Sequence, residues 1–457
     1  MKKISVTVLL LLTVIFCWAK PPKYVFYFIG DGMGPSHVLG TELYLGEREG
    51  VIGRPNKLSF TQMPYTAFVT TFSASNGVTD SAASGTALAT GNKTNNGHLG
   101  VTPDGNPVYS IAWDAHKAGY AVGISSTCPI NHATPGAFYA HQKSRNNYPQ
   151  IAEEMLTAGY DFYAGGDPIC NNEQRKKLYS DATEQGYSIV RGYDEFKEKE
   201  EQANKIMLYQ KDIATEIPYT IDRDDDDLTL AQITEAGIEF MSKKSKKGFF
   251  FMVEGGKIDY ASHSNDVATM MHEVIDFSNA IEVALKFYEK HKNETLIIVT
   301  ADHETGGIVL GFNHSYTLNL KAIAEQEVSA DNMSKILIKA ADNSKEFSWN
   351  DAKELLKENF GLWDEVRVDE YYEKEMKKSF PATATDSDVN ERNNKLKHIA
   401  QLAKEALAHD AAISWASGNH SATFVPLFAI GVGAKDFHGV IDNTDIPKMI
   451  GKIANYR

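Results

Sequence analysis

The sequence predicts an α/β fold: a three-layer α/β/α sandwich around a largely parallel central sheet, with a helical insertion that forms a lid or crown. Short apolar runs, typical of strands buried on both faces of a parallel sheet, lie at residues 24–29, 249–253 and 296–299. Helical patterns lie between them, at residues 108–118, 149–158, 228–242 and 266–290. Strands that alternate with helices along a chain favour this architecture.

Three carboxylates follow the predicted strands. Asp31 comes two residues after the first, Glu254 directly after the second, and Asp302 shortly after the third. In open α/β sheets ligands bind beyond the carboxyl ends of the strands. We therefore expect these side chains at one edge of the sheet. Further strands are predicted at residues 121–125 and 424–432.

Residues 318–412 differ in composition from the rest. They are rich in Lys, Glu, Asp, Asn and Ala with helical spacing, as in 349–360 and 394–409. We interpret them as a mostly helical insertion near the mouth of a site, within one domain spanning residues 20–457. No metal-ligand or nucleophile motif lies inside it.

The first nineteen residues resemble a secretory signal peptide. Lys2 and Lys3 precede an apolar run at 4–16, and cleavage is expected after Ala19. The run is too short to span a membrane stably, and no later segment looks transmembrane. The protein is therefore expected to be periplasmic or secreted. A lipoprotein anchor at Cys17 is the alternative, although Phe16 stands where a small residue is usual.

The charge balance excludes one class of protein. The formal net charge is −14, and loss of Lys2 and Lys3 makes it two units more negative. A nucleic-acid binder would normally carry a basic surplus. Cys128 and Cys170 could pair in an oxidising compartment, but nothing requires it. The acidic run 222–227 fits a solvated turn better than a calcium site, because its spacing is not that of an EF-hand.

The segment VTDSAASGTA, residues 78–87, places a hydroxyl at the start of an alanine-rich helix. Asp80 or Ser81 is well placed as its N-cap, and a serine there is usually only a cap. A helix N-terminus also stabilises an alkoxide or a bound phosphate. No Ser-His-Asp motif supplies a base. A nucleophilic Ser81 would therefore need a metal to lower its pKa.

Several segments carry candidate metal ligands. Asp259 and His263, in VEGGKIDYASH, are four residues apart and share one face of a helical turn. Asp302 and His303 are adjacent after a strand, and His420 lies in the glycine-containing loop SGNH before a strand. Each alone has a plainer explanation, as a surface pair, a loop or a structural histidine. Together, in this order, they indicate a centre of Asp and His ligands, which suits zinc.

A second kind of centre is indicated by oxygen ligands. Thr134, in NHATP at residues 131–135, offers a hydroxyl, and Glu254 and Asp31 offer carboxylates. Such a set suits magnesium. Arg145 could clamp a phosphate with its planar fork. Taken alone, an exposed arginine would be the commoner interpretation.

These motifs together resemble the metal-dependent alkaline phosphatase family over residues 23–312 and 414–433. The resemblance implies a phosphomonoesterase that acts on phosphate monoesters by double in-line displacement through a phosphoserine, and a homodimeric assembly. It implies two zinc ions and one magnesium ion. The implied ligand sets are Asp259, His263 and His420 for the first zinc; Asp31, Asp302 and His303 with Ser81 for the second; and Asp31, Thr134 and Glu254 for magnesium.

The resemblance also gives roles to three further side chains. It implies that Arg145 binds two phosphate oxygens. His132 stands where some family members have Asp, and Tyr260 where others have Lys, His or Trp. Both would lie at the substrate, and their identity bears on magnesium preference and phosphate affinity.

Three other functions fit these motifs less well. A sulfatase is disfavoured because its Cys- or Ser-x-Pro-x-Arg signature is missing around Ser81. A phosphodiesterase of the same superfamily usually lacks the magnesium ligands and the arginine clamp, whereas Thr134, Glu254 and Arg145 are all here. A non-catalytic secreted protein that binds metal or phosphate would have little reason to keep Ser81 together with every ligand.

Overall fold

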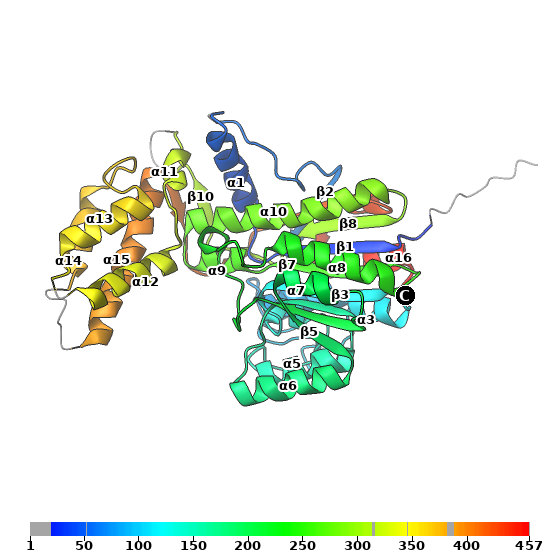
Figure 1. Ribbon diagram of the computed structural model, residues 1–457. Coiled ribbons are helices and arrows are strands. Elements are labelled where there is room, and N and C mark those ends of the chain that lie inside the picture. The colour runs from blue at the N-terminus through cyan, green and yellow to red at the C-terminus, as the bar shows by residue number, and fades with distance from the viewer. Residues whose placement is uncertain (1–19, 52, 313–315, 345, 382–387, 457) are drawn as a thin grey trace, which may run out of the picture.

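A computed structural model describes residues 20–51, 53–312, 316–344, 346–381 and 388–456. The predicted signal peptide and Cys17 lie outside the described residues. The core is a ten-stranded sheet (Figure 1). Its strands, in spatial order, are β14 (Gly439–Asp442), β2 (Tyr65–Thr70), β13 (Val425–Gly431), β8 (Thr295–Thr300), β1 (Tyr24–Gly30), β7 (Phe249–Gly255), β3 (Ala121–Pro129), β4 (Phe162–Gly166), β6 (Lys205–Tyr209) and β5 (Tyr187–Arg191).

The sheet is largely parallel. Only β13, among the strands of this sheet, runs antiparallel to both of its neighbours, β8 and β2. The central strands β3, β7 and β8 are buried along their whole length. This burial explains why they are continuous apolar runs in the sequence. The predicted fold class is confirmed.

Helices cover both faces of the sheet. Alternate residues of β7 mark the two sides: the Phe251 ring lies against Gly237 of α8, whereas Phe250 packs near Phe138 on the opposite face. One layer contains α1 (Pro35–Arg48), α7 (Gly192–Lys199), α8 (Leu230–Lys244) and α10 (Val267–Lys290). The other contains α2 (Ser81–Thr90), α3 (Ile111–Lys117), α4 (Ala133–Gly136), α5 (Tyr148–Ala158), α6 (Asn172–Glu184) and α16 (Asp445–Ala454).

The predicted helices at residues 108–118, 149–158, 228–242 and 266–290 correspond to α3, α5, α8 and α10. Side-chain caps fix where three of them begin. Ser110, Thr229 and Asp266 accept hydrogen bonds from Trp113, Gln232 and Thr269 backbone amides, respectively. Short 3₁₀ turns, η1 (Thr220–Asp222) and η2 (Ala434–Asp436), occur in the connections.

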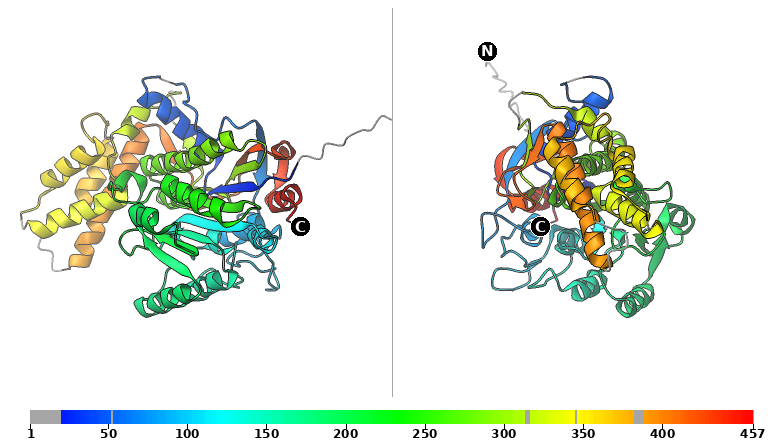
Figure 2. Two further views of the ribbon diagram at one scale, coloured as in Figure 1. Left: turned by 45° about the vertical axis from the view of Figure 1, so that its right-hand side comes forward. Right: turned by 90° about the vertical axis from the view of Figure 1, so that its left-hand side faces the viewer.

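Five helices between residues 320 and 410 form a lobe beside the sandwich (Figures 1 and 2). They are α11 (Leu320–Ala324), α12 (Ala330–Asn343), α13 (Trp349–Phe360), α14 (Glu370–Ser379) and α15 (Val389–Asp410). The predicted helix at 349–360 is α13, and that at 394–409 is the body of α15. At the base of the lobe, β10 (Ile308–Leu310) pairs antiparallel with β11 (Ile413–Trp415).

The lobe is held by hydrogen bonds at the start of α10. Asp266 caps α10 and also accepts from the Gln326 side chain at 2.8 Å and the Ala330 amide at 2.9 Å. Ser329, the N-cap of α12, donates to Asp222 from its amide at 2.8 Å and its hydroxyl at 2.5 Å. The acidic run 222–227 is therefore only partly a solvated turn: residues 224–226 are exposed, but Asp222 anchors the lobe.

Two further findings concern the described residues only. No helix among them combines the length and apolar character needed to cross a bilayer. Cys128 is buried and Cys170 partly exposed, and both are free thiols.

Candidate metal and phosphate site

The parallel strands deliver carboxylates to one edge of the sheet. Ile29 of β1 is in register with Glu254 of β7 and with Thr300 of β8. Asp31 and Asp302 follow these strands within two residues, so they lie at the same edge as Glu254. All three side chains are fully buried. The expected convergence of these residues is what the structure shows.

Asp259, His263 and His420 form a first group, whose candidate ligand atoms all lie within 4.8 Å of one another. Asp259 and His263 lie on α9 (Lys257–His263), where Nε2 of His263 is 3.3 Å from Asp259 Oδ2. His420 comes from β12 (His420–Ser421), which pairs antiparallel with β9 (Glu304–Thr305). This short pairing brings His420 beside α9.

The ring tautomers of this group are fixed by main-chain carbonyls. Nδ1 of His263 donates to the Gly418 carbonyl at 2.7 Å, and Nδ1 of His420 donates to the Thr79 carbonyl at 2.8 Å. The two Nε2 atoms then face each other at 3.2 Å. Two lone pairs at that distance repel unless a proton or a cation lies between them. The arrangement therefore fits a metal ion.

Asp259 accepts a hydrogen bond from the His263 ring, and this interaction raises the pKa of His263 to about 9. Without a metal, a proton thus occupies this group at neutral pH. Because a histidine must be neutral to bind a metal, metal binding here must release that proton.

Asp31, Asp302 and His303 form a second group with the same spacing. Nε2 of His303 lies 3.4 Å from Asp31 Oδ1, 3.2 Å from Asp302 Oδ2 and 3.2 Å from the hydroxyl of Ser81. Both oxygens of Asp31 and Oδ2 of Asp302 are buried without a hydrogen-bond donor among the described residues. Burial, reinforced by the neighbouring carboxylates, raises the pKa of Asp31 well above its usual range and that of Asp302 to about 8.

Buried carboxylates without donors are costly unless a cation compensates them. The second group therefore also fits a metal ion. The rings of His303 and His420 stack with centroids 3.5 Å apart, so the two groups are in direct contact.

A third set consists of oxygens. Both carboxylate oxygens of Glu254 and the Thr134 hydroxyl are buried without a hydrogen bond of normal geometry. Burial raises the pKa of Glu254 to about 7, opposed by interactions with Ser126, Thr134 and Asp31, which surround it. An oxygen-only set suits a hard cation such as magnesium. Ser126, in register with Glu254 on β3, was not identified from the sequence.

Ser81 is the first residue of α2, and its side chain is buried among these groups. Asp80 is the N-cap: its Oδ1 accepts from the Ala83 amide at 3.0 Å. The other oxygen of Asp80 accepts from Nη1 of Arg145 at 3.2 Å. Asp80 therefore both starts the helix that carries Ser81 and places a guanidinium beside it.

His132 contacts Arg145, a relation that the sequence did not indicate. Nη2 of Arg145 donates to Nε2 of His132 at 3.0 Å. Burial, and to a smaller extent the positive charge of Arg145, lowers the pKa of His132 to about 3. The imidazole is therefore neutral and accepts the hydrogen bond from Arg145. The Tyr260 ring meets the His132 ring edge-on, with centroids 5.8 Å apart. His132 thus positions Arg145, and Tyr260 packs against His132.

Thr305 links the first and second groups of candidate metal ligands, which are called the two metal groups below. The sequence did not indicate this residue. Its hydroxyl donates to Asp259 Oδ1 at 2.5 Å and lies 3.2 Å from Nδ1 of His303, from which it can accept. Gly32, with φ of +74°, makes room for it, since a Cβ there would lie 2.8 Å from the threonine oxygen. A threonine two residues after His303 carries no recognisable signal until the antiparallel pair β9–β12 is known.

The chain matches known proteins over nearly its whole length. A family model described as Alkaline phosphatase matches residues 22–165 and 163–456. Alkaline phosphatase 4 of Bacillus subtilis (strain 168) is 32% identical over 442 residues, covering 94% of this chain and 88% of the relative. Alkaline phosphatase of Escherichia coli (strain K12) is 33% identical over 334 residues, covering 62% and 70%.

Solved structures agree with this similarity. The cold-active alkaline phosphatase from the psychrophile Shewanella sp. superposes with a TM-score of 0.79 at 29% identity, covering 94% of this chain and 99% of that one. The alkaline phosphatase of Thermus thermophilus gives a TM-score of 0.78 at 25% identity, covering 96% and 92%.

Replacing Thr305 with Val tests the link between the metal groups. The substitution keeps the shape but removes the donor to Asp259 and the acceptor for His303. We expect zinc affinity, measured by competition with a chelator on metal-free protein, to fall about 10- to 100-fold, the usual cost of losing such a partner. Thr305→Ser should restore most of it.

Thr300→Val is the matched control. Thr300 is equally buried, but its hydroxyl donates to the Pro426 carbonyl at 3.1 Å and not to a metal ligand. It should lower the unfolding temperature without changing zinc affinity. Equal zinc affinities for Thr305→Val and the unmodified protein would mean that Thr305 only fills space.

Proposed function

We propose that this chain, which belongs to the alkaline phosphatase family and is a phosphoric monoester hydrolase, transfers the phosphoryl group to Ser81 at a site for two zinc ions and one magnesium ion. One observation carries the proposal: the Ser81 hydroxyl lies 3.2 Å from His303 of the buried second Asp/His group, and Asp80, the residue before Ser81, holds Arg145. Residues 1–19 further support a periplasmic or secreted location.

The donor sets determine which ion each group would hold. Asp259, His263 and His420 would hold one zinc ion. Asp31, Asp302 and His303 would hold the other, next to Ser81. When bound, these ions would lower the pKa of the attacking hydroxyl and offset the charge that develops on the departing oxygen.

Helix α2 positions Ser81 to attack the phosphorus atom. The backbone of Ser81 begins the helix, so the helix N-terminus directs partial positive charge toward a bound phosphate. One carboxylate oxygen of Asp80 accepts a hydrogen bond from the Ala83 amide, and the other accepts one from Arg145. Attack by the Ser81 oxygen forms a phosphoserine and expels the alcohol, and water then releases inorganic phosphate.

Arg145 is placed to bind the phosphoryl oxygens. Its side chain is 22% exposed, held at one end by Asp80 and at the other by His132. The guanidinium offers further donors in a planar fork, which matches two non-bridging oxygens of a monoester. It would neutralise their charge in the transition state.

Asp31, Thr134 and Glu254 would hold magnesium, although His132 puts a neutral imidazole nearby instead of a carboxylate. Variants of the alkaline phosphatase from the Antarctic bacterium TAB5, in which a histidine is replaced by Glu or Asp, are described as having Mg bound in the M3 site. They are each 26% identical to this chain. We propose by analogy that magnesium binds weakly here and that a carboxylate at position 132 would strengthen it.

Removing the nucleophile tests the central proposal. Ser81→Ala should lower turnover of an aryl phosphate by roughly 10³-fold or more, because a nucleophile acts as a unit with its activators. Zinc content, measured by elemental analysis, should stay near two per chain. In the unmodified protein, chelation should abolish activity and zinc plus magnesium should restore it. Full activity without metal, or an acid-trapped phosphate on another residue, would refute the proposal.

Arg145→Ala separates a monoesterase from a phosphodiesterase. A monoester presents more charge on the oxygens that Arg145 would bind. We expect kcat/KM for an aryl monoester to fall roughly 30- to 1,000-fold, corresponding to about 2–4 kcal/mol. The fall for the matching diester should be much smaller. Arg367→Ala, at an exposed loop residue, is the control. Equal losses on both esters would contradict the role.

The third metal site is tested by His132→Asp, alone and together with Tyr260→Lys. An added carboxylate attracts the divalent cation, so magnesium affinity measured by titration should rise roughly tenfold or more. The added lysine should strengthen inhibition by inorganic phosphate. Unchanged magnesium affinity and phosphate inhibition would leave both residues as packing partners of Arg145.

A further inference from the structure

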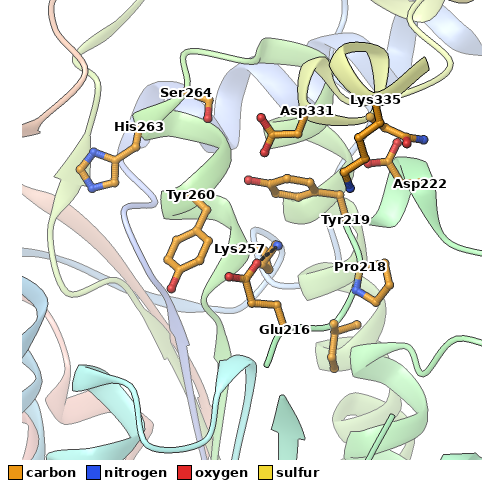
Figure 3. A pocket seen from close by; sticks show the side chains of 12 residues that line it. Glu216, Pro218, Tyr219, Asp222, Lys257, Tyr260, His263, Ser264, Asp331 and Lys335 are labelled. Carbon is orange, nitrogen blue, oxygen red and sulfur yellow. Dashed lines mark hydrogen bonds and ion pairs between the residues drawn. The ribbon is translucent and has the colours of Figure 1, made fainter. Parts of the chain in front are cut away.

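A pocket of about 550 Å³ opens beside the first metal group. Small-molecule sites usually measure roughly 300–1,000 Å³. Its walls come from α9, from the segment 216–222 and from α12 of the helical lobe. Figure 3 shows Tyr260 and His263 projecting from α9, with Tyr219, Asp331 and Lys335 on the other side of the space.

Helix α9 connects this pocket with the metal groups. Asp259 and His263, four residues apart, lie on one stripe of the helix and form the first metal group. Lys257 and Tyr260, three residues apart, lie on the neighbouring stripe and line the pocket. His263 belongs to both. If the alcohol of a phosphate ester departs toward His263, it therefore moves into this pocket.

Most charged groups of the pocket already have partners. The amine of Lys257 donates to Glu216 at 2.6 Å and lies 3.8 Å from the centroid of the Tyr219 ring. Asp222 accepts both hydrogen bonds from Ser329. Glu216 and Asp222 are therefore satisfied by the protein itself.

Asp331 and Lys335 are different. Both are exposed, and neither makes a side-chain hydrogen bond or ion pair with another residue of the described chain. They stand one turn apart on α12. The wall that carries them is fixed, because Asp266 and Asp222 hold the first residues of the helix. The carboxylate of Asp331 and the ammonium group of Lys335 are thus available to a ligand in the pocket.

We propose that this pocket binds the alcohol half of the ester and that Asp331 and Lys335 select hydroxyl-rich alcohols, that is sugars and polyols. The inference rests on the proposed function, since it assigns the leaving group of the same reaction. A hydroxyl both donates and accepts, so neighbouring hydroxyls can bond to Asp331 and Lys335 together. A singly charged alcohol would be attracted by one and repelled by the other.

The tyrosine rings complete the match. Tyr219 and Tyr260 both line the pocket, and their rings offer apolar surface to the carbon skeleton. A purely aliphatic alcohol would remove water from Asp331 and Lys335 without replacing its hydrogen bonds. A site built to bond hydroxyls discriminates strongly against analogues that lack them.

Glycerol 1-phosphate and n-propyl phosphate form a matched pair of probes, because they differ only by two hydroxyl groups. We expect the metal-loaded enzyme to prefer glycerol 1-phosphate in kcat/KM. Asp331→Ala should reduce that preference about tenfold, the loss typical of one charged hydrogen bond, mainly through a higher KM. Lys335→Met should reduce it in the same direction.

Asp364→Ala is the control, since this exposed aspartate of the lobe does not line the pocket. It should leave the ratio unchanged, and thermal unfolding should show all variants folded. Equal use of both esters by the unmodified enzyme, or equal losses on both in Asp331→Ala, would overturn the pocket assignment while the phosphatase proposal stands. Failure to hydrolyse either ester would overturn both.

Discussion

Negative charge held away from water at the carboxyl edge of the sheet is the constraint on which the site depends. Asp31, Glu254, Asp259 and Asp302 are each at most 3% exposed. Five of these carboxylate oxygens, on Asp31, Glu254 and Asp302, have no hydrogen-bond partner among the described residues. Such a cluster is stable only with compensating cations or bound protons. Metal binding and the integrity of this edge are therefore expected to be coupled, as in other metal sites.

The surrounding residues orient the candidate metal ligands and do not neutralise their charge. Main-chain carbonyls of Thr79 and Gly418 fix the tautomers of His420 and His263, and Thr305 joins Asp259 to His303. The ligands and these partners together come from four segments, at residues 79, 259–263, 303–305 and 418–420. They are held by the pairing of β9 with β12 and by the helix start at Asp80. The ligands are consequently oriented before any ion arrives, which reduces the reorganisation that binding requires.

The helical lobe is tied to this frame at its inner end. Asp266 joins the cap of α10, directly after α9, to the first amide of α12. Lys404 of α15 donates to the carbonyl of Ser264, next to His263. A lobe that would otherwise be remote thus presents one end of α12 beside a candidate metal ligand. Phosphoryl chemistry and choice of alcohol are in this way carried by different parts of the fold.

The sequence by itself determined the fold class, the family and the ester class. Buried parallel strands are continuous apolar runs, and the carboxylates that follow β1 and β8 signal the active edge because parallel strands share that edge. The Asp259 and His263 pair was visible because helical spacing is local. The roles proposed for Ser81, Arg145 and the ligands came from motif resemblance and stay predictions.

Only the tertiary structure decided which groups touch. The bond between Arg145 and His132, the bridge made by Thr305, and the choice of Asp80 as the N-cap depend on contacts between segments or on exact helix starts. The same holds for the pocket, whose walls are α9, the segment 216–222 and the start of α12, which are far apart in the chain. Residue spacing encodes neighbours within one helix or strand. It does not encode the register of short antiparallel pairs or the docking of a lobe, because these are set by packing and hydrogen bonds between distant segments.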